Sequence, residues 1–166
     1  MSVLGRGAGP SYVLPKTAAC LAALVAFAVL VAGCGQGEGV SSGATVTAYV
    51  EARLCRGAEE RLASAGGGAG DVRVKAICLS SPWSGKKLSL ATVGGNARRA
   101  TEDSAAVAYL EAPGRASRFA HPILESAEIA WIASSSGKQA MAQLLQAIDT
   151  AGSSGNLREE LNKSLD

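Results

Sequence analysis

The stretch that decides the fold is Ser104–Gly137, SAAVAYLEAPGRASRFAHPILESAEIAWIASSSG. Residues 105–110 and 129–133 are short apolar runs bounded by turn-forming residues, as expected of buried parallel strands. Residues 114–127 between them predict a helix, in which Pro122 should cause a bend. The apolar side chains of that helix recur at four-residue spacing, at Phe119, Ile123 and Ala127. Two parallel strands joined by a helix form a right-handed crossover, so this stretch predicts the centre of an α/β sheet.

Further strands and helices flank this stretch. Two more strands are predicted at 46–50 and 72–79, and helices at 58–65, 89–100, 138–149 and 156–165. The start of the strand at 72–79 alternates between apolar and charged side chains, which predicts an edge position. Four strands alternating with helices predict an α/β fold: a three-layer sandwich with a small parallel four-stranded sheet.

Glycines and loops mark the boundaries between these elements. Residues 54–57 are predicted to be the loop after the first strand. The glycine-rich run at 66–70 follows a helix and precedes a strand, the wrong order for a phosphate-binding loop, so it predicts a turn. Gly94 and Gly95 would weaken the helix that contains them by roughly 1 kcal/mol each relative to alanine. Close packing of that helix on the sheet would explain their presence.

The first 33 residues have the composition of a secretion signal. Arg6 and Lys16 precede an uncharged stretch, 17–33, made almost wholly of Ala, Leu and Val. It ends in Leu30-Val31-Ala32-Gly33-Cys34, which resembles the bacterial lipobox that is cut before a cysteine destined for lipidation. The alternative is an uncleaved membrane anchor, for which the run is short. We therefore predict a lipoprotein signal peptide at 1–33, lipidation of Cys34, and extracytoplasmic attachment to the cell membrane.

Cleavage at this site would change both the charge and the cysteine content. Lys plus Arg would fall from 16 to 14 against 14 acids, so no net charge remains, and aromatic residues make up only 4% of the chain. This composition gives no support to nucleic-acid binding. Cys55 and Cys78 would be the remaining pair in an oxidising compartment, which predicts a disulfide; two buried thiols are the alternative. Residues 34–44 are Gly- and Ser-rich and predict a flexible tether, followed by a single domain at 45–166.

The loops at the carboxyl ends of the strands are the candidate binding region. Ligands of open α/β sheets sit beyond these ends, which here points to Glu111-Ala112-Pro113-Gly114 and Ser134-Ser135-Ser136-Gly137. Trp83, in the loop after the second strand, could cover a ligand, although packing of that loop against the sheet edge is the favoured explanation. The side chains expected at the site are those of Ser134, Ser135, Ser136 and Trp83.

No catalytic constellation is present in the sequence. His121 is the one histidine, and its nearest acid is Glu125, at helical spacing, so a satisfied or solvent-facing histidine is expected rather than a catalytic base. The serine run lacks the glycine that a nucleophile elbow places two residues before its serine. Neither a cofactor nor a metal site is predicted. A noncatalytic protein is expected.

The order of these motifs resembles a known family. The order along the chain is a strand, a helix, the Ala65-Gly66-Gly67 turn, a strand, a helix ending Asn96-Ala97-Arg98-Arg99-Ala100, a strand, a helix containing Pro122-Ile123-Leu124-Glu125, a strand and a Ser-rich loop. This order is similar to the amino-terminal lobe of leucine/isoleucine/valine-type (type I periplasmic) substrate-binding proteins of ABC importers. The resemblance covers about Thr45 to Gly137.

The resemblance implies a function and a set of binding residues. In that family, hydroxyls and backbone amides on the loops after the third and fourth strands hold an amino acid's carboxylate, which implies roles for Ala112 and for Ser134–Ser136. Glu111 departs from the family's pattern, and its charge would repel a carboxylate. The implied partners are a small solute such as an amino acid, an ABC permease or another membrane protein, and the membrane through Cys34.

Two functional classes follow from this comparison. The first is a solute-binding lipoprotein reduced to one lobe, because the last two helices resemble the family's carboxyl-terminal ending and follow the fourth strand directly. A homodimer with facing clefts could then rebuild a two-walled site. The second is a noncatalytic cell-surface interaction lipoprotein that keeps the lobe as a scaffold without ligand binding.

Overall fold

The computed structural model describes residues 43–152 and 156–165. The predicted signal peptide, Cys34 and nearly all of the tether lie outside these residues. Within the part of the chain that is described, none of the helices has the length and apolar character needed to cross a membrane.

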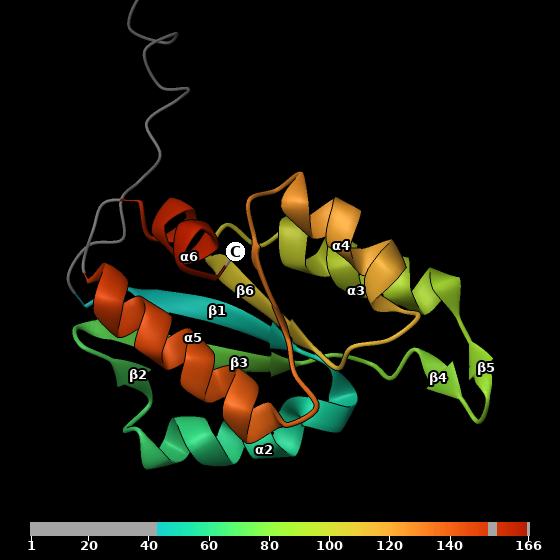
Figure 1. Ribbon diagram of the computed structural model, residues 1–166, viewed down its shortest axis with the longest axis horizontal. Helices are drawn as coiled ribbons and strands as arrows, with labels where there is room; N and C mark the ends of the chain where they lie inside the picture. Colours follow the sequence, from blue (N-terminus) through green and yellow to red (C-terminus); the bar gives the residue numbers. More distant parts are fainter. Residues whose placement is uncertain (1–42, 153–155, 166) are drawn as a thin grey trace, which may run out of the picture. The chain divides into compact units, whose positions relative to one another are not determined.

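The fold is α/β, built on a five-stranded sheet in the order β2-β3-β1-β6-β7 (Figure 1). Its strands are β1 (Thr45–Val50), β2 (Gly68–Ala69), β3 (Val72–Cys78), β6 (Ala106–Glu111) and β7 (Ala130–Ala133). The four predicted strands are all present and run parallel to one another. A two-stranded hairpin, β4 (Trp83–Ser84) and β5 (Lys87–Leu88), lies apart from the sheet.

The prediction of a purely parallel, four-stranded sheet is wrong because of β2, which pairs antiparallel with the start of β3. The glycine run forms more than a turn. Gly66 and Gly67 adopt positive φ angles and reverse the chain, and Gly68 then lies so close to the Val72 backbone that a Cβ atom would not fit. Only glycine permits this return onto β3. Because β2 is two residues long, the rest of β3 remains an edge.

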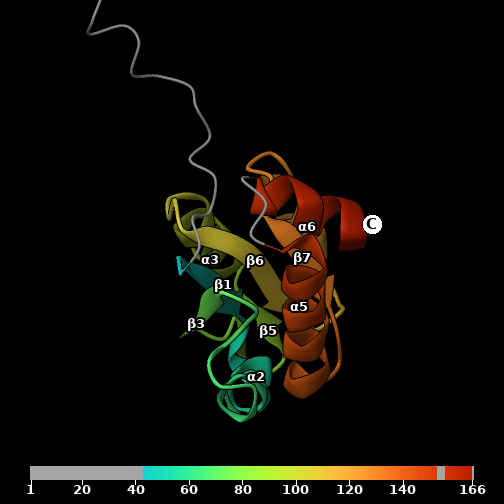
Figure 2. The same cartoon turned by 90° about the vertical axis from the view of Figure 1, so that its left-hand side faces the viewer.

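Five helices cover the sheet in the described part of the chain: α2 (Ala52–Ser64), α3 (Leu90–Thr101), α4 (Ser117–Glu125), α5 (Gly137–Ala151) and α6 (Leu157–Leu165). Buried side chains form two clusters, one between the sheet and α2, α5 and α6, the other between the sheet and α3 and α4. Figure 2 shows α3 and α5 on opposite sides of the strands. The predicted stripe of α5, which includes Met141 and Leu144, is fully buried.

Three local predictions are corrected. Residues 54–57 belong to α2, which begins directly after Glu51, so they are not a loop. Helix α4 buries Ser117, Ala120 and Leu124. Of its predicted face, Ile123 and Ala127 are partly buried against the core, but the prediction was wrong for Phe119, which is 49% exposed. Gly94 and Gly95 have open space where a Cβ atom would be. Close packing does not explain these two glycines.

Close packing does explain Gly57 and Gly137, at the crossing of α2 and α5. A Cβ atom on Gly137 would collide with the Leu54 carbonyl oxygen, and one on Gly57 would lie 3.1 Å from the Lys138 nitrogen. The two helices therefore touch backbone to backbone at this point. This contact holds the start of α5, and with it the serine loop, against the start of α2.

Candidate functional site

The carboxyl ends of β1 and β6 form the point at which the sheet changes winding direction. The chain passes from β1 outward to β3 on one side and continues from β6 to β7 on the other, so the loops after β1 and β6 diverge at this switch point, where open α/β sheets commonly bind ligands. Glu51 follows β1, and Ala112 follows β6. The sequence prediction placed the site at the β6 and β7 loops and missed Glu51, although an acid directly after a buried strand was a readable signal.

The Glu51 carboxylate lies at this switch point. Glu51 is only 4% exposed, and both of its carboxylate oxygens accept hydrogen bonds. The Ala112 backbone N–H donates to Oε2 at 2.8 Å, and Arg53 Nε donates to Oε1 at 2.7 Å. The amide that the family resemblance implies for a ligand carboxylate is therefore bound to a carboxylate of the chain itself.

Glu111, the last residue of β6, is a second buried acid at the same end of the sheet. It is 3% exposed, and Trp131 Nε1, on the neighbouring strand, donates to its Oε1 at 2.9 Å. Burial raises the pKa of Glu111 above its usual range, the bond from Trp131 acts against this, and the Glu51 charge adds to it. Burial, Glu111 and Glu51 together raise the pKa of Tyr109 as well.

The three serines divide into one structural residue and two exposed ones. Ser134 is buried, and its N–H donates to the Glu111 carbonyl at 3.0 Å. Its hydroxyl accepts from Ser136 N–H at 3.2 Å and donates to the Ser136 carbonyl at 3.1 Å, so it closes the loop that leads into α5. Ser135 and the Ser136 side chain lie on the surface at the carboxyl end of β7.

Trp83 lies in the β4–β5 hairpin, away from the β1–β6 switch point. Its backbone pairs with Leu88, and its indole Nε1 is buried without a hydrogen-bond partner. His121 lies on α4, where its ring meets Trp131 edge-on at 4.7 Å between centroids and its Nδ1 is 3.9 Å from Glu125 Oε2. Neither residue is joined to Glu51 and Ala112 by a hydrogen bond in the described part of the chain.

The predicted cysteine pair is joined by a disulfide. Cys55, near the start of α2, is bonded to Cys78, at the end of β3, with Cα atoms 5.6 Å apart. Glu59 lies beside them. Because the two sulfurs are bonded to each other, they form a covalent link between α2 and β3 and are not free to bind a metal.

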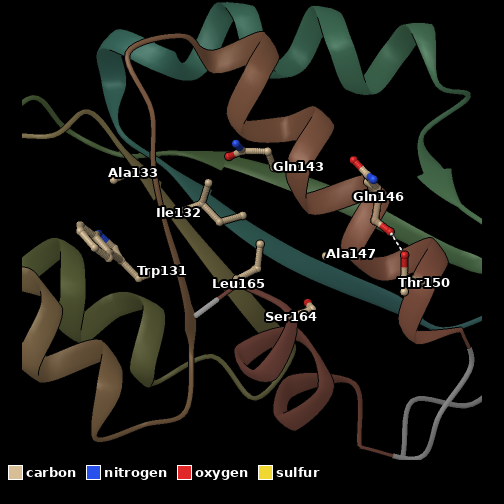
Figure 3. A pocket seen from close by; sticks show the side chains of 9 residues that line it. All are labelled: Trp131, Ile132, Ala133, Gln143, Gln146, Ala147, Thr150, Ser164 and Leu165. Carbon is tan, nitrogen blue, oxygen red and sulfur yellow. Dashed lines mark hydrogen bonds between the residues drawn. The ribbon is translucent and has the colours of Figure 1, made fainter.

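A groove of about 590 Å³ lies elsewhere, along the open edge of β7. Figure 3 shows Trp131, Ile132 and Ala133 on one wall, Gln143, Gln146 and Thr150 from α5 opposite, and Ser164 and Leu165 from α6 below. The lining is neutral. No predicted site residue lies in this groove.

Comparison with known proteins finds no matching family model, no similar curated protein and no similar solved structure.

Proposed function

We propose that this chain is a noncatalytic interaction lipoprotein of the cell surface, attached to the membrane through lipid on Cys34, and that its α/β domain is a scaffold for a protein partner. One observation carries the proposal: the Ala112 N–H already donates its hydrogen bond to the Glu51 carboxylate. A free amino acid would have to displace a carboxylate that is covalently part of the chain and is buried in place.

The polar groups around Glu51 support the same conclusion. The Ser134 hydroxyl is hydrogen-bonded to the backbone of its own loop. Glu111 is a second buried acid at a place where a solute carboxylate would need positive charge. His121 lies against Trp131 rather than beside a nucleophile. Among the described residues, these polar groups therefore provide neither a reactive group nor an open anion site at the switch point.

A second candidate is the solute-binding lipoprotein, with a three-layer domain like one lobe of a type I periplasmic binding protein and an ABC permease as partner. One observation favours it: Ser135 and Ser136 are exposed at the carboxyl end of β7, where two hydroxyls could contact a small polar ligand such as an amino acid. In this case a second wall would have to come from another chain.

Calorimetric titration of the chain with leucine, isoleucine and valine separates the two candidates. We expect no binding heat from a protein whose circular dichroism shows the folded state. Binding that disappears in the combined variant Ser134→Ala, Ser135→Ala, Ser136→Ala would establish the solute receptor and overturn the interaction proposal.

A further inference from the structure

Exposed cations gather at the carboxyl end of the sheet. Four chain segments bring them there, because the starts of α2, α4 and α5 and the β4–β5 hairpin all follow the carboxyl end of a strand (Figure 1). The exposed residues of this cationic end are Arg53, Arg56, Lys86, Lys87, Arg115, Arg118 and Lys138. The exposed acids of α2, Glu59 and Glu60, are the counter-charges on these segments.

Most of this positive charge has no counter-charge in the described part of the chain. Arg56 and Lys138 share one acid, Glu60, at 3.1 Å and 2.9 Å, and together they lower its pKa, Lys138 more than Arg56. Arg53 is paired with the buried Glu51. The remaining four cations, Lys86, Lys87, Arg115 and Arg118, form no ion pair there.

The helix ends reinforce this charge instead of balancing it. A helix amino terminus carries a partial positive charge and is ordinarily accompanied by acids in its first turn. The helices α2, α3, α4 and α5 all begin at this end and have none in their first turns, although the buried Glu51 precedes α2 directly; α6, which begins elsewhere, has Glu159 and Glu160. Arg53, Arg118 and Lys138 lie in first turns, where a cation is unfavourable for the helix.

Two apolar side chains complete the surface. Leu90 and Phe119 are the large apolar residues exposed in the described part of the chain, at 53% and 49%. Both lie in the first turn of a helix, α3 or α4, and therefore at the cationic end. Arginine and aromatic side chains are enriched at the centres of protein interfaces.

We propose that the cationic end binds an acidic polypeptide segment that also carries apolar side chains. This inference rests on the proposed interaction function and names its partner by charge. An anionic membrane surface fits less well, because membrane-binding helices lie flat with a broad apolar face, whereas here helix ends and two separate apolar side chains face the partner. In addition, β1 begins at the opposite end of the sheet, so the predicted lipid attachment joins the domain there.

The test uses the full-length chain in neutral detergent micelles and a labelled acidic peptide that alternates glutamate and leucine. Fluorescence anisotropy should show binding that weakens as salt is added. Combined replacement Arg115→Ala and Arg118→Ala should lower the affinity about tenfold or more, as expected for two charges in contact with the partner. The matched control, Arg98→Ala with Arg99→Ala, removes two exposed cations from the last turn of α3 and should change the affinity less than about twofold.

Three outcomes would overturn the inference: no peptide binding, an equal loss in both double variants, or a dependence on Arg115 and Arg118 seen only with phosphatidylglycerol vesicles. Leucine is titrated into the same samples. If leucine binds and depends on the serine loop, the proposed function fails. If neither leucine nor the acidic peptide binds, the inference of an acidic partner is rejected, and the solute-receptor function receives no support either.

Discussion

Replacement of Glu51 by alanine should cost more stability than any other single change at the β1–β6 switch point. A hydrogen bond to a charged group contributes about 1.5–3 kcal/mol, which is the expected value of the Ala112 N–H bond because that bond is partly buried. The bond to Arg53 adds no more than about 1 kcal/mol, since the arginine side chain is 55% exposed. The total, about 2–4 kcal/mol, is a large share of the stability of a small domain.

Urea unfolding of the wild type, Glu51→Ala, Glu51→Gln and Arg53→Ala measures these contributions separately. Arg53→Ala removes only the exposed ion pair with Glu51, and Glu51→Gln keeps an acceptor for the Ala112 N–H. Both variants should therefore lose much less stability than Glu51→Ala. If the Glu51 carboxylate occupies an anion-binding position at the switch point, added acetate should recover part of the stability lost in Glu51→Ala, and chloride at equal ionic strength should not. A Glu51→Ala loss no larger than that of Arg53→Ala would refute the reasoning.

Three further predictions concern neighbouring features. The raised pKa of Glu111 means that the folded state holds its proton more tightly than the unfolded state. The stability of the wild type should therefore fall as the pH rises from about 4.3, the ordinary pKa of glutamate, through the raised pKa. In urea titrations over this pH range, Glu111→Gln should gain stability relative to the wild type, and a constant difference between the two would contradict this. Gly137→Ala should destabilise the protein by about 3 kcal/mol or more because its methyl group would meet the Leu54 carbonyl. Gly95→Ala, with open space around it, should instead stabilise the protein by about 0.5–1 kcal/mol. Thermal unfolding that ranks the two variants the other way would refute the crossing geometry. Sedimentation at low salt should show no dimer with facing clefts, because the two cationic ends would repel each other, and a dimer that survives low salt and depends on Arg118 would contradict this.

The periodic parts of the fold could be predicted from the sequence because each depends on neighbouring residues. The apolar runs of β1, β3, β6 and β7 mark buried strands without knowledge of their partners, and Ser89 caps α3 as its position indicates. The face of α4 was misjudged because phenylalanine is apolar but exposed there, while the small Ser117 and Ala120 lie against the sheet. Strand β2 was missed because two residues carry no periodicity.

The site was harder to predict than the fold because its contacts join distant residues. Glu51 and Ala112 are 61 positions apart, and their contact depends on the pairing of β1 with β6, including a register shift after Thr47. Nothing in the local sequence of either residue specifies that register. The serine loop was located correctly at the end of β7, but its separation into buried Ser134 and exposed Ser135 depends on a hydrogen bond to the end of β6.

The cations at the helix starts connect stability with function. Arg118 in the first turn of α4 opposes the helix dipole and forms no ion pair in the described part of the chain, so Arg118→Ala should leave stability unchanged or raise it by a few tenths of a kcal/mol, up to about 1 kcal/mol. Arg98, in the last turn of α3, favours its helix, and Arg98→Ala should lower stability by a similar amount. If binding of the acidic peptide falls only in the variant whose stability does not fall, the cation at α4 is explained by its partner rather than by the fold. A loss of stability in Arg118→Ala would instead assign that residue a structural role and remove this argument for a binding surface.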